Sequence, residues 1–580
     1  MQIGPQTRVG DYFHAMKYRG DGEDFREANN RVASALKDSD SHYHALREIT
    51  GAMRFMFAGR IQSAMGSARA TTPYNCYVSG TIEDSFVHGD GNIMQRATEA
   101  AATMRMGGGI GYDFSSLRPK GDIIRKLQSH SSGPVSFMSI FDAVCKCVAS
   151  SGHRRGAQMG VLRVDHPDIE EFLHAKQNTT ALTGFNISIA VTDAFMEAVH
   201  AGRTFNLTWG GEVYREVDAP ALWEGVMRST WDWAEPGVLF IDTINRMNNL
   251  WYCETIAATN PCGEQPLPPF GACLLGSFNL AKYVRPSFAR PDGSIVWSFD
   301  RDQLLADIPH VVRAMDNVVD RARYPLPQQR MEALNKRRMG LGVTGLANAV
   351  EALGFPYGSR DALRWTEEVL ELIAVEAYRA SALLAAEKGA FTLFDAERYL
   401  KGEFIKKLPD DVRALIAKHG IRNSHLTSIA PTGTISLCAD NVSSGLEPVF
   451  DYLTARPVNT PGGVEMVEVE DYGVREFGVR GRRANEVKPQ EHIAALTTAQ
   501  KWVDSAVSKT CNLDGTVAWE DFKRLYSSAW EGGAKGCTTF NIDGKRMALL
   551  TGKTRGDAPK AEEPATACFI DPETGRRECA

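Results

Sequence analysis

The chain has 580 residues with 65 Lys and Arg against 71 Asp and Glu, so its formal net charge is −6. This length allows several domains or one large domain with attachments, and a charge so near neutral gives no reason to expect binding to nucleic acid or to an anionic membrane. No apolar run approaches the roughly 20 residues that span a bilayer, and the start lacks a signal-peptide core, so we expect a cytoplasmic protein.

The predicted secondary structure changes in character along the chain. Residues 1–65 carry sparse apolar positions on polar faces and are expected to form a short helical N-terminal segment. Strands separated by helices then predict right-handed βαβ units, and therefore an α/β fold with a mainly parallel sheet, open or closed into a barrel. The expected strands lie at 77–78, 110–112, 185–191 and 427–429, and the expected helices at 91–106, 135–150, 221–234, 311–323 and 360–388.

The densest chemistry lies in one short stretch, Asn260–Pro261–Cys262–Gly263–Glu264. In an extended backbone alternate side chains point the same way, so Asn260, Cys262 and Glu264 would face one volume. The prolines that follow exclude a helix and favour a loop or a strand edge. An amide, a thiol and a carboxyl that converge can bind a hydroxylated substrate, attack it or abstract from it, and move a proton. From these residues alone, a proline-rich turn with a buried cysteine is the alternative.

Seven segments in order, spread over most of the chain, resemble the catalytic subunit of ribonucleotide reductase, and chiefly its adenosylcobalamin-dependent class II. They are YNCYVSGTIEDS (74–85), RMGGGIGYDFSSLRPKG (105–121), SGHRRGAQMG (151–160), DHPDIEEF (165–172), NPCGEQPLPPFGACLLGSFNL (260–280), RRMGLGVTGLA (337–347) and APTGTIS (430–436).

The resemblance implies a fold and a reaction. The fold is a ten-stranded α/β barrel of two half-barrels, with the catalytic cysteine on a central finger loop. A thiyl radical at Cys262 would abstract the ribose 3′-hydrogen, Glu264 would take the 3′-hydroxyl proton as the 2′-hydroxyl leaves as water, and Asn260 would hold the hydroxyls. Burial would keep water and oxygen from the radical. The product is a 2′-deoxyribonucleotide for DNA synthesis.

Removing a hydroxyl also requires two electrons, which the resemblance assigns to further cysteines. Cys76 and Cys273 match the family's reducing pair, although only the fold can bring such distant positions to disulfide distance. Cys568 and Cys579, in a tail rich in Pro, Ala, Glu and Thr, match the mobile dithiol that re-reduces this pair and then meets thioredoxin or glutaredoxin. Two incidental cysteines in a flexible tail are the alternative. The remaining cysteines are expected to be structural, and no metal site is expected.

Two loops are expected to bind the substrate. Thr432, Gly433 and Thr434 follow a short apolar run and combine hydroxyls with free backbone N–H groups, which suit phosphate. The resemblance identifies this as the substrate's phosphate loop. It also identifies 151–156 as the loop that carries an effector's signal to the substrate base, with Arg155 as the expected substrate contact.

The region from 84 to 160 would build the allosteric site of the family, where a deoxynucleoside triphosphate or ATP selects the base that is reduced. The glycine-rich run 107–111 does not match a dinucleotide-binding fingerprint. Asp84 would accept from the effector's 3′-hydroxyl, and Arg105 and Arg118 would pair with its phosphates, for which guanidinium groups are suited. A helix N-cap is the other interpretation of Asp84, and both can hold.

The radical generator separates two classes of the family. Class I subunits relay the radical through adjacent tyrosines from a metal-containing partner protein, whereas the corresponding positions here are Thr538 and Thr539. Threonine is not redox-active at accessible potentials, which favours adenosylcobalamin as the cofactor. A class I subunit with an unusual relay is the alternative. A nucleotide-binding regulator without chemistry is a further rival, against which the five expected catalytic residues argue.

The predicted organisation has three parts: the helical segment 1–65, which resembles no ATP-binding cone, the catalytic barrel 66–555 and the redox tail 556–580. The wording of the motifs favours a ribonucleoside diphosphate over a triphosphate as substrate. A homodimer is expected, because effector sites of the family usually lie at a dimer interface.

Overall fold

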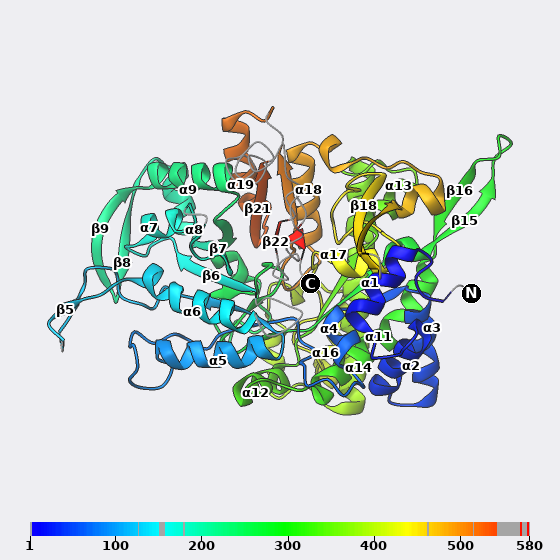
Figure 1. Ribbon diagram of the computed structural model, residues 1–580, viewed down its shortest axis with the longest axis horizontal. Helices are drawn as coiled ribbons and strands as arrows, with labels where there is room; N and C mark the ends of the chain where they lie inside the picture. Colours follow the sequence, from blue (N-terminus) through cyan, green and yellow to red (C-terminus); the bar gives the residue numbers. More distant parts are fainter. Residues whose placement is uncertain are drawn as a thin grey trace.

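The computed structural model describes residues 3–125, 127–149, 157–177, 180–460, 463–513 and 516–541, and the backbone of 569–570 and 577–578. The chain begins with three helices, drawn in blue in Figure 1. Each has a side-chain cap that accepts a hydrogen bond from its first turn, from Thr7, Asp24 and Ser39 in turn. The N-terminal elements are α1 (Arg8–Tyr18), α2 (Phe25–Leu36), α3 (Asp40–Gly51), β1 (Phe55–Phe57) and α4 (Gly59–Ala64).

The largest sheet has eight strands, and five of them follow one another in parallel. In spatial order it holds β13 (Ala272–Cys273), β2 (Cys76–Val78), β3 (Gly109–Asp113), β6 (Gln158–Arg163), β7 (Phe185–Val191), β10 (Gly237–Phe240), β21 (Gly536–Asn541) and β20 (Thr510–Leu513). The parallel run is β2 to β10, joined by helical crossovers as the alternating pattern predicts. At its two ends the direction reverses, since β21 is antiparallel to β10 and β13 is antiparallel to β2.

A second sheet has three strands in the order β1, β14 (Leu275–Asn279) and β17 (Gly340–Thr344). Its β14 follows β13 after one residue, so the stretch 272–279 pairs with both sheets. Two isolated parallel bridges, Leu341 to Thr427 and Ile429 to Val507, continue from β17 toward β20. The expected strand at 427–429 is therefore present as bridges and not as a regular ladder.

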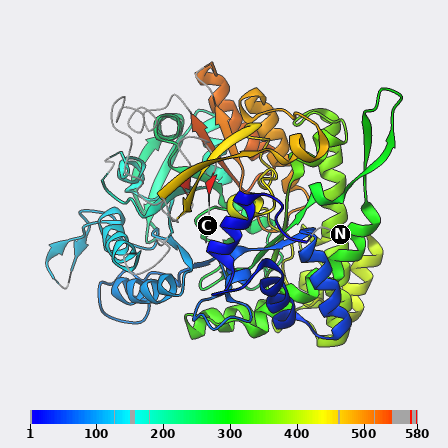
Figure 2. The same cartoon turned by 45° about the vertical axis from the view of Figure 1, so that its right-hand side comes forward.

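Helices cover the sheet and fill the rest of the body, while several hairpins lie at the surface. The β15–β16 hairpin projects from the body in both views (Figure 1, Figure 2). The helices are α5 (Ile93–Arg105), α6 (Pro134–Ala149), α7 (Ile169–His174), α8 (Asp193–His200), α9 (Ala219–Trp233), α10 (Ile241–Arg246), α11 (Arg301–Arg321), α12 (Pro327–Lys336), α13 (Leu346–Ala352), α14 (Arg360–Lys388), α15 (Ala396–Tyr399), α16 (Asp410–His419), α17 (Gly433–Cys438), α18 (Pro489–Gln500) and α19 (Trp519–Glu531). The hairpins are β4–β5 (Ile123–Ile124, Ser129–His130), β8–β9 (Thr204–Trp209, Glu212–Asp218), β15–β16 (Val284–Ala289, Ile295–Phe299), β18–β19 (Leu453–Thr460, Gly463–Glu470) and β22–β23 (Phe569–Ile570, Arg577–Glu578).

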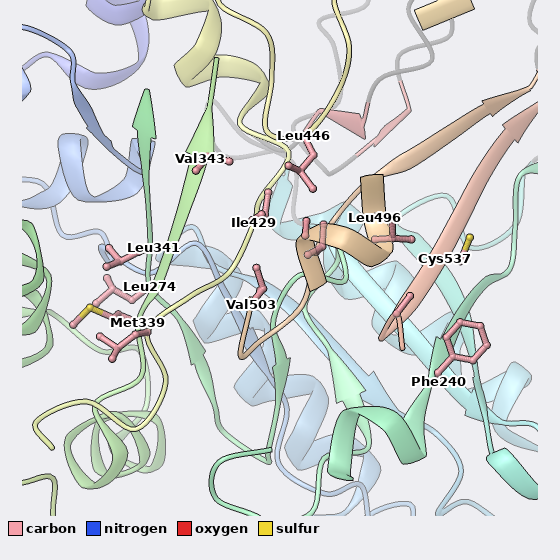
Figure 3. Packing of buried hydrophobic residues seen from close by; sticks show 14 of the residues in the cluster. Phe240, Leu274, Met339, Leu341, Val343, Ile429, Leu446, Leu496, Val503 and Cys537 are labelled. Carbon is pink, nitrogen blue, oxygen red and sulfur yellow. The ribbon is translucent and has the colours of Figure 1, made fainter. Parts of the chain in front are cut away.

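The two faces of the large sheet have different cores. One face contributes to the main hydrophobic cluster, part of which Figure 3 shows, with Leu341, Ile429 and Val503 converging from three segments. The other face contributes to a separate inner cluster that contains Cys76 and Val78 of β2, Met159 of β6 and Leu239 of β10. Alternate residues of one strand thus face different cores, as strand geometry requires.

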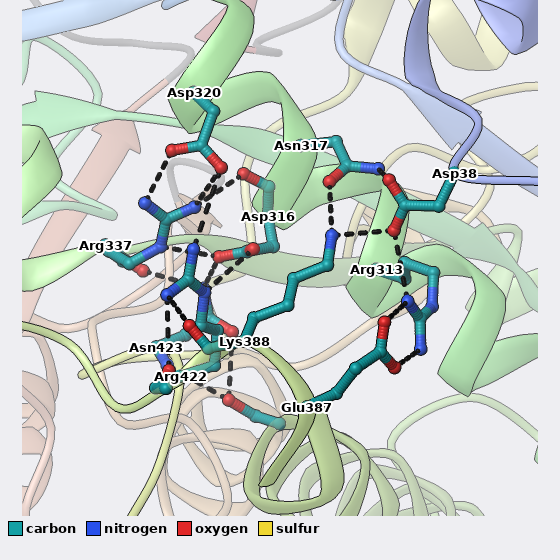
Figure 4. A network of polar contacts seen from close by, with 12 residues as sticks. Asp38, Arg313, Asp316, Asn317, Asp320, Arg337, Glu387, Lys388, Arg422 and Asn423 are labelled. Carbon is teal, nitrogen blue, oxygen red and sulfur yellow. Dashed lines mark hydrogen bonds and ion pairs between the residues drawn. The ribbon is translucent and has the colours of Figure 1, made fainter. Parts of the chain in front are cut away.

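A network of ion pairs holds the N-terminal helices to the body (Figure 4). Asp38, between α2 and α3, accepts hydrogen bonds from Arg313 at 3.0 Å, Asn317 at 2.8 Å and Lys388 at 2.6 Å. These partners lie on α11 and α14, so one carboxylate joins three elements. The contacts lower the pKa of Asp38 to about 2 despite the opposing effect of burial.

The described chain is thus an α/β protein, as the sequence predicts. Among the residues described, no helix is both long and apolar enough to cross a membrane. Within the same ranges, no group of three or more His, Cys, Asp or Glu side chains could hold a metal ion.

Candidate active site

The stretch with the densest chemistry lies in the loop of a small hairpin, between β11 (Ala258–Thr259) and β12 (Pro266–Leu267). The Gly263 N–H donates to the Asn260 carbonyl at 3.1 Å, and Gly263 has φ of +82°. The loop is therefore a turn, with Pro261 in the second position that turns favour. The expected loop is therefore confirmed, but an extended backbone within it is wrong, because the chain reverses at Pro261 and Cys262.

The turn nevertheless brings two of the three expected groups into contact. The Asn260 amide donates from Nδ2 to Glu264 Oε1 at 2.8 Å, and its Oδ1 accepts from the Gln265 N–H at 3.0 Å. Asn260 is fully buried, and Cys262 and Glu264 are each 2% exposed. The amide thus fixes the carboxyl group in a site that excludes bulk water.

The loop is held from two directions by distant strands. The Asn186 side chain of β7 donates to the Pro261 carbonyl at 3.0 Å. On the other side, the Ser428 hydroxyl and the Ala506 N–H both donate to the Glu264 carbonyl at 2.9 Å. The loop therefore lies between β7 and the segments that bridge β17 to β20.

Glycine on β3 makes this close approach possible. A Cβ atom added at Gly111 would lie 1.8 Å from the carbonyl oxygen of Thr259, the last residue of β11. One added at Gly109 would lie 3.1 Å from the Cys76 sulfur and 3.3 Å from Pro261. The glycine-rich run thus accommodates the loop, a role that the sequence left open.

The expected reducing pair is adjacent in the structure. Cys76 of β2 and Cys273 of β13 are directly opposite partners in an antiparallel ladder, both buried and both free thiols. Burial, and after it the nearby Glu264 carboxylate, raises the pKa of Cys76 to about 12 and that of Cys273 well above its usual range. The Asn260 side chain is hydrogen-bonded to Cys76 and lowers its pKa to a smaller extent. Two thiols, an amide and a carboxyl therefore share one enclosed volume.

Cys262 itself is disulfide-bonded. Its partner is none of the eight free cysteines of the described part of the chain. Cys568, Cys579 and Arg155 lie outside the described residues. The backbone of β22 and β23, which flank 571–576, is described, and β23 contacts α17.

The expected phosphate loop runs into α17. Thr432 has φ of +56°, and its hydroxyl contacts the Thr344 hydroxyl at 3.0 Å and accepts from the Gly445 N–H at 2.7 Å. Gly433 and Thr434 are half-buried, whereas Thr432 is buried. Ala430, just before this loop, packs against the inner cluster that contains Cys76 and Cys273. The loop thus borders the same inner region as the cysteines.

Two of the three expected effector residues meet. Arg118 donates from Nε to Asp84 Oδ2 at 2.7 Å and from its backbone N–H to Oδ1 at 3.1 Å. Arg105, the last residue of α5, is exposed, and within the described part of the chain it forms no hydrogen bond or ion pair with Asp84 or Arg118. The N-cap of α5 is Asn92, so the alternative interpretation of Asp84 as the cap of this helix is wrong.

Sequence reasoning missed the residues that hold the loop: Asn186, Ser428 and the backbone of Ala506. Ser428 falls within a strand that the sequence predicts, but nothing in 504–508 signals a contact with Glu264. Thr538 and Thr539 lie on β21, where the Thr539 hydroxyl contacts the Tyr526 hydroxyl at 3.0 Å.

Comparison with known proteins identifies the family. A family model described as the ribonucleotide reductase barrel domain matches residues 74–481 and 481–540. A vitamin B12-dependent ribonucleoside-diphosphate reductase of Mycobacterium tuberculosis is 36% identical, with 82% of this chain and 68% of the relative covered. One of Thermoplasma acidophilum is 35% identical, covering 84% and 63%. A vitamin B12-dependent ribonucleotide reductase of Streptomyces coelicolor is 28% identical, covering 94% and 64%.

The chain spans about two thirds of the length of these relatives. The matched region contains the loop 260–265, the cysteine pair and the threonine-rich loop before α17. The relatives are named as vitamin B12-dependent enzymes, in agreement with the class expected from Thr538 and Thr539 in the sequence. This chain belongs to the ribonucleotide reductase family, as a class II catalytic subunit.

Proposed function

We propose that this protein reduces ribonucleoside diphosphates to 2′-deoxyribonucleoside diphosphates with adenosylcobalamin as cofactor. The names of the relatives support both the reaction and the cofactor. The observation that carries the assignment of the site is the enclosed group of Asn260, Glu264, Cys76 and Cys273 around the loop of Cys262. Class I chemistry is not favoured.

The residues fit a radical-generating cofactor of this kind. The sulfur of Cys262, a residue that is 2% exposed, can carry an unpaired electron away from water, and adenosylcobalamin, when bound, supplies the radical by homolysis of its cobalt–carbon bond. We assign Cys262 as the group that takes the 3′-hydrogen of the ribose. The radical would form from a free thiol, so the disulfide at Cys262 must first be reduced.

The other groups then move a proton and two electrons. Glu264, held by the Asn260 amide, takes the 3′-hydroxyl proton, and the 2′-hydroxyl leaves as water. The thiols of Cys76 and Cys273 supply two protons and two electrons and become a disulfide. High thiol pKa values keep both in the protonated form that hydrogen transfer needs, and opposite positions in one ladder require little movement to join them.

We further propose a closed ten-stranded barrel of two half-barrels with the loop of Cys262 as its central finger. The order of pairing supports it: the eight-stranded sheet ends at β13 and β20, β13 continues into β14, and bridges lead from β17 through 427–429 to 507. The proposed parts of the chain are the helical segment 1–65, the catalytic barrel 66–555 and the redox tail 556–580.

The remaining assignments concern ligands and partners. Thr432, Gly433 and Thr434 would bind the substrate phosphates and Arg155 the substrate, while Asp84, Arg105 and Arg118 would bind a deoxynucleoside triphosphate or ATP. Cys568 and Cys579 would re-reduce the cysteine pair and exchange with thioredoxin or glutaredoxin. A cytoplasmic homodimer is proposed, because the family places effector sites at a dimer interface.

The test is turnover of the purified full chain with adenosylcobalamin, dithiothreitol and a ribonucleoside diphosphate, with no second protein. We expect deoxyribonucleoside diphosphate to form. Cys262→Ser should abolish product while effector binding survives, because serine cannot carry the radical. The matched control is Cys253→Ser, at an exposed thiol outside the site, which should retain turnover. Turnover that appears only with a metal-containing partner protein would contradict the cofactor assignment.

A further inference from the structure

A buried carboxylate outside the site described above organises the two strands that hold the loop of Cys262. Asp504, in the segment between α18 and β20, is 1% exposed. It lies two residues before Ala506, whose N–H donates to the Glu264 carbonyl. No motif marks Asp504 in the sequence, and the proposed reaction does not use it directly.

The carboxylate ties its own segment to the neighbouring strand. Its Oδ2 accepts from the Leu426 N–H at 2.6 Å, and its Oδ1 accepts from the Thr427 N–H at 3.1 Å. In the opposite direction, the Asp504 N–H donates to the Thr427 hydroxyl at 2.8 Å. The Ser505 N–H donates to the Thr427 carbonyl at 3.1 Å. Four hydrogen bonds therefore lock 426–427 against 504–505.

Both groups that hold the Glu264 carbonyl lie next to this junction. Ser428 follows Thr427 directly, and its hydroxyl donates at 2.9 Å, while Ala506 follows Ser505, and its N–H donates at 2.9 Å. The two donors converge on one oxygen only if their strands keep a fixed spacing. Asp504 is the side chain that bonds to both strands at this point.

The surroundings hold Asp504 in turn. The Tyr378 hydroxyl of α14 donates to Oδ2 at 2.7 Å, and the buried Lys535 amine donates to the Asp504 main-chain carbonyl. Ile429 and Val503, on either side of the junction, pack in the main hydrophobic cluster (Figure 3). A carboxylate with several buried donors is costly to replace, because each donor loses its acceptor in a dry environment.

We propose that Asp504 is a positioning residue for the reductase reaction, which acts through Ser428 and Ala506 on the Glu264 backbone and so sets the geometry of the 260–264 turn. This inference rests on the proposed function. It predicts that a substitution which weakens the hydrogen bonds of the Asp504 carboxylate slows the chemical step and leaves substrate binding at the threonine loop largely intact. A displacement of a reacting group by a fraction of an ångström is enough for such an effect.

The first measurement compares steady-state kinetics of Asp504→Asn with a matched buried variant. Asn removes one acceptor and presents an N–H₂ group to a backbone donor, so we expect kcat to fall about tenfold or more with KM within about twofold of wild type. The control is Asp307→Asn, at a buried carboxylate that is 2% exposed and also accepts from a tyrosine hydroxyl, Tyr283 at 2.8 Å, as well as from the Arg54 guanidinium at 2.7 Å. Its partners do not touch the Glu264 carbonyl, so kcat should stay within about twofold of wild type below the unfolding temperature.

A double-mutant cycle separates positioning from general stability. Ser428→Ala removes one donor to the Glu264 carbonyl and should lower kcat about threefold or more in the wild-type background. In the Asp504→Asn background the same change should cost less than about twofold, because the two act on the same carbonyl, whereas in the Asp307→Asn background it should keep its full effect. If Ser428→Ala keeps its full effect in the Asp504→Asn background, the proposal is overturned.

Two further measurements test the proposal even if the protein shows no turnover or if Asp504→Asn does not fold. Amide hydrogen exchange of a peptide that covers 258–267 should speed up in Asp504→Asn and not in Asp307→Asn, even if the wild-type chain shows no turnover and the proposed function fails. If Asp504→Asn does not fold, Tyr378→Phe removes only one donor to the carboxylate and should show the same exchange change and the same coupling to Ser428→Ala on a smaller scale. Unchanged exchange in both variants would overturn the proposal.

Discussion

At the scale of single residues, the candidate active site requires glycine at some positions as much as it requires particular side chains at others. Gly111 of β3 has no room for a Cβ atom, because the Thr259 carbonyl would lie 1.8 Å from it. That carbonyl belongs to the residue before Asn260. The hydrogen atom of a glycine therefore sets how closely the loop approaches the sheet.

We expect Gly111→Ala to lower the free energy of unfolding by about 3 kcal/mol or more, as overpacking in a rigid core does, and to lower turnover sharply by displacing Asn260. Chemical denaturation and steady-state kinetics measure the two effects. The control is Gly225→Ala in α9, where no atom lies within 4 Å of the added Cβ. This change should raise stability by about 0.5–1 kcal/mol and leave turnover unchanged. Equal stability losses in the two variants would contradict the steric argument.

Which residues meet in the candidate site could be predicted in part at this scale, but the local backbone geometry could not. The residue types of Asn260 and Glu264 indicate substrate binding and proton transfer. In the structure, Asn260 Nδ2 lies 2.8 Å from Glu264 Oε1. The turn that ends at Gly263 was missed, because the prolines around it favour an extended backbone. The positive φ of Gly263, which the turn uses, is known only from the structure. Asp504 was missed because a buried aspartate in a loop has no distinguishing pattern before the strands around it are known.

At the scale of elements, the proposed effector region is built from two segments that are separate in the sequence. Asp84 lies in the loop before α5, and Arg118 follows β3; the ion pair between them at 2.7 Å joins the two segments. Both residues are partly exposed, so a ligand with hydroxyl and phosphate groups can compete for them. This contact is therefore the core of the proposed effector site.

We expect Asp84→Asn to weaken binding of a deoxynucleoside triphosphate about tenfold and to blunt its influence on which base is reduced. The reason is that the amide keeps the size of the carboxyl group but loses its charge toward Arg118. Equilibrium dialysis with the triphosphate and competition between two ribonucleoside diphosphates measure the effects. Lys120→Gln, which alters an exposed ion pair with Glu171, is the control. If Asp84→Asn binds the triphosphate as tightly as the wild-type chain does, the assignment of Asp84 to the effector site is contradicted.

The success of element prediction followed the strength of the local signal. The helix at 360–388 was placed with correct bounds, because Ser359 caps it and Gly389 ends it. The helix expected at 311–323 begins ten positions earlier, at Arg301, since Asp300 caps it and Pro309 is tolerated within it. The strand at 427–429 has short apolar runs but only isolated bridges. Side-chain contacts from Asp504, which local patterns do not encode, complete its pairing.

At the scale of the whole molecule, burial of titratable groups couples stability to pH. Burial lowers the pKa of several histidines, and that of His14, packed in the N-terminal helices, falls to about 4, with a further contribution from Arg19. The others are His42, His166, His310, His425 and His492. These side chains are neutral in the folded chain, whereas the unfolded chain takes up protons below about pH 6.5.

We therefore expect the free energy of unfolding to fall as pH drops from about 6.5 toward 4, because the unfolded state binds more protons there. His14 alone can account for up to about 3 kcal/mol of this loss. Urea denaturation at pH 7, 6 and 5 measures the slope. His14→Gln should flatten this slope, because the variant lacks the imidazole that the unfolded chain protonates. Equal slopes for wild type and His14→Gln would refute the assignment.

The arrangement of the whole molecule could not be derived from local patterns alone. Alternating strands and helices predict an α/β protein, but the order in which the strands pair depends on partners that are far apart in the chain, such as β10 with β21 and β2 with β13. Loop closure over such distances has no local signature. Resemblance to the family supplied what periodicity could not, including the pairing of Cys76 with Cys273.

The stretch 272–279 serves two sheets within eight consecutive positions. An inserted or deleted residue anywhere in it would shift one set of partners relative to the other, and side chains on the shifted part would exchange their inner and outer orientation. Cys273 would then turn away from Cys76, or Asn279 from its place opposite Thr344. We therefore expect the length of this stretch to be invariant among functional variants, even where its residues change.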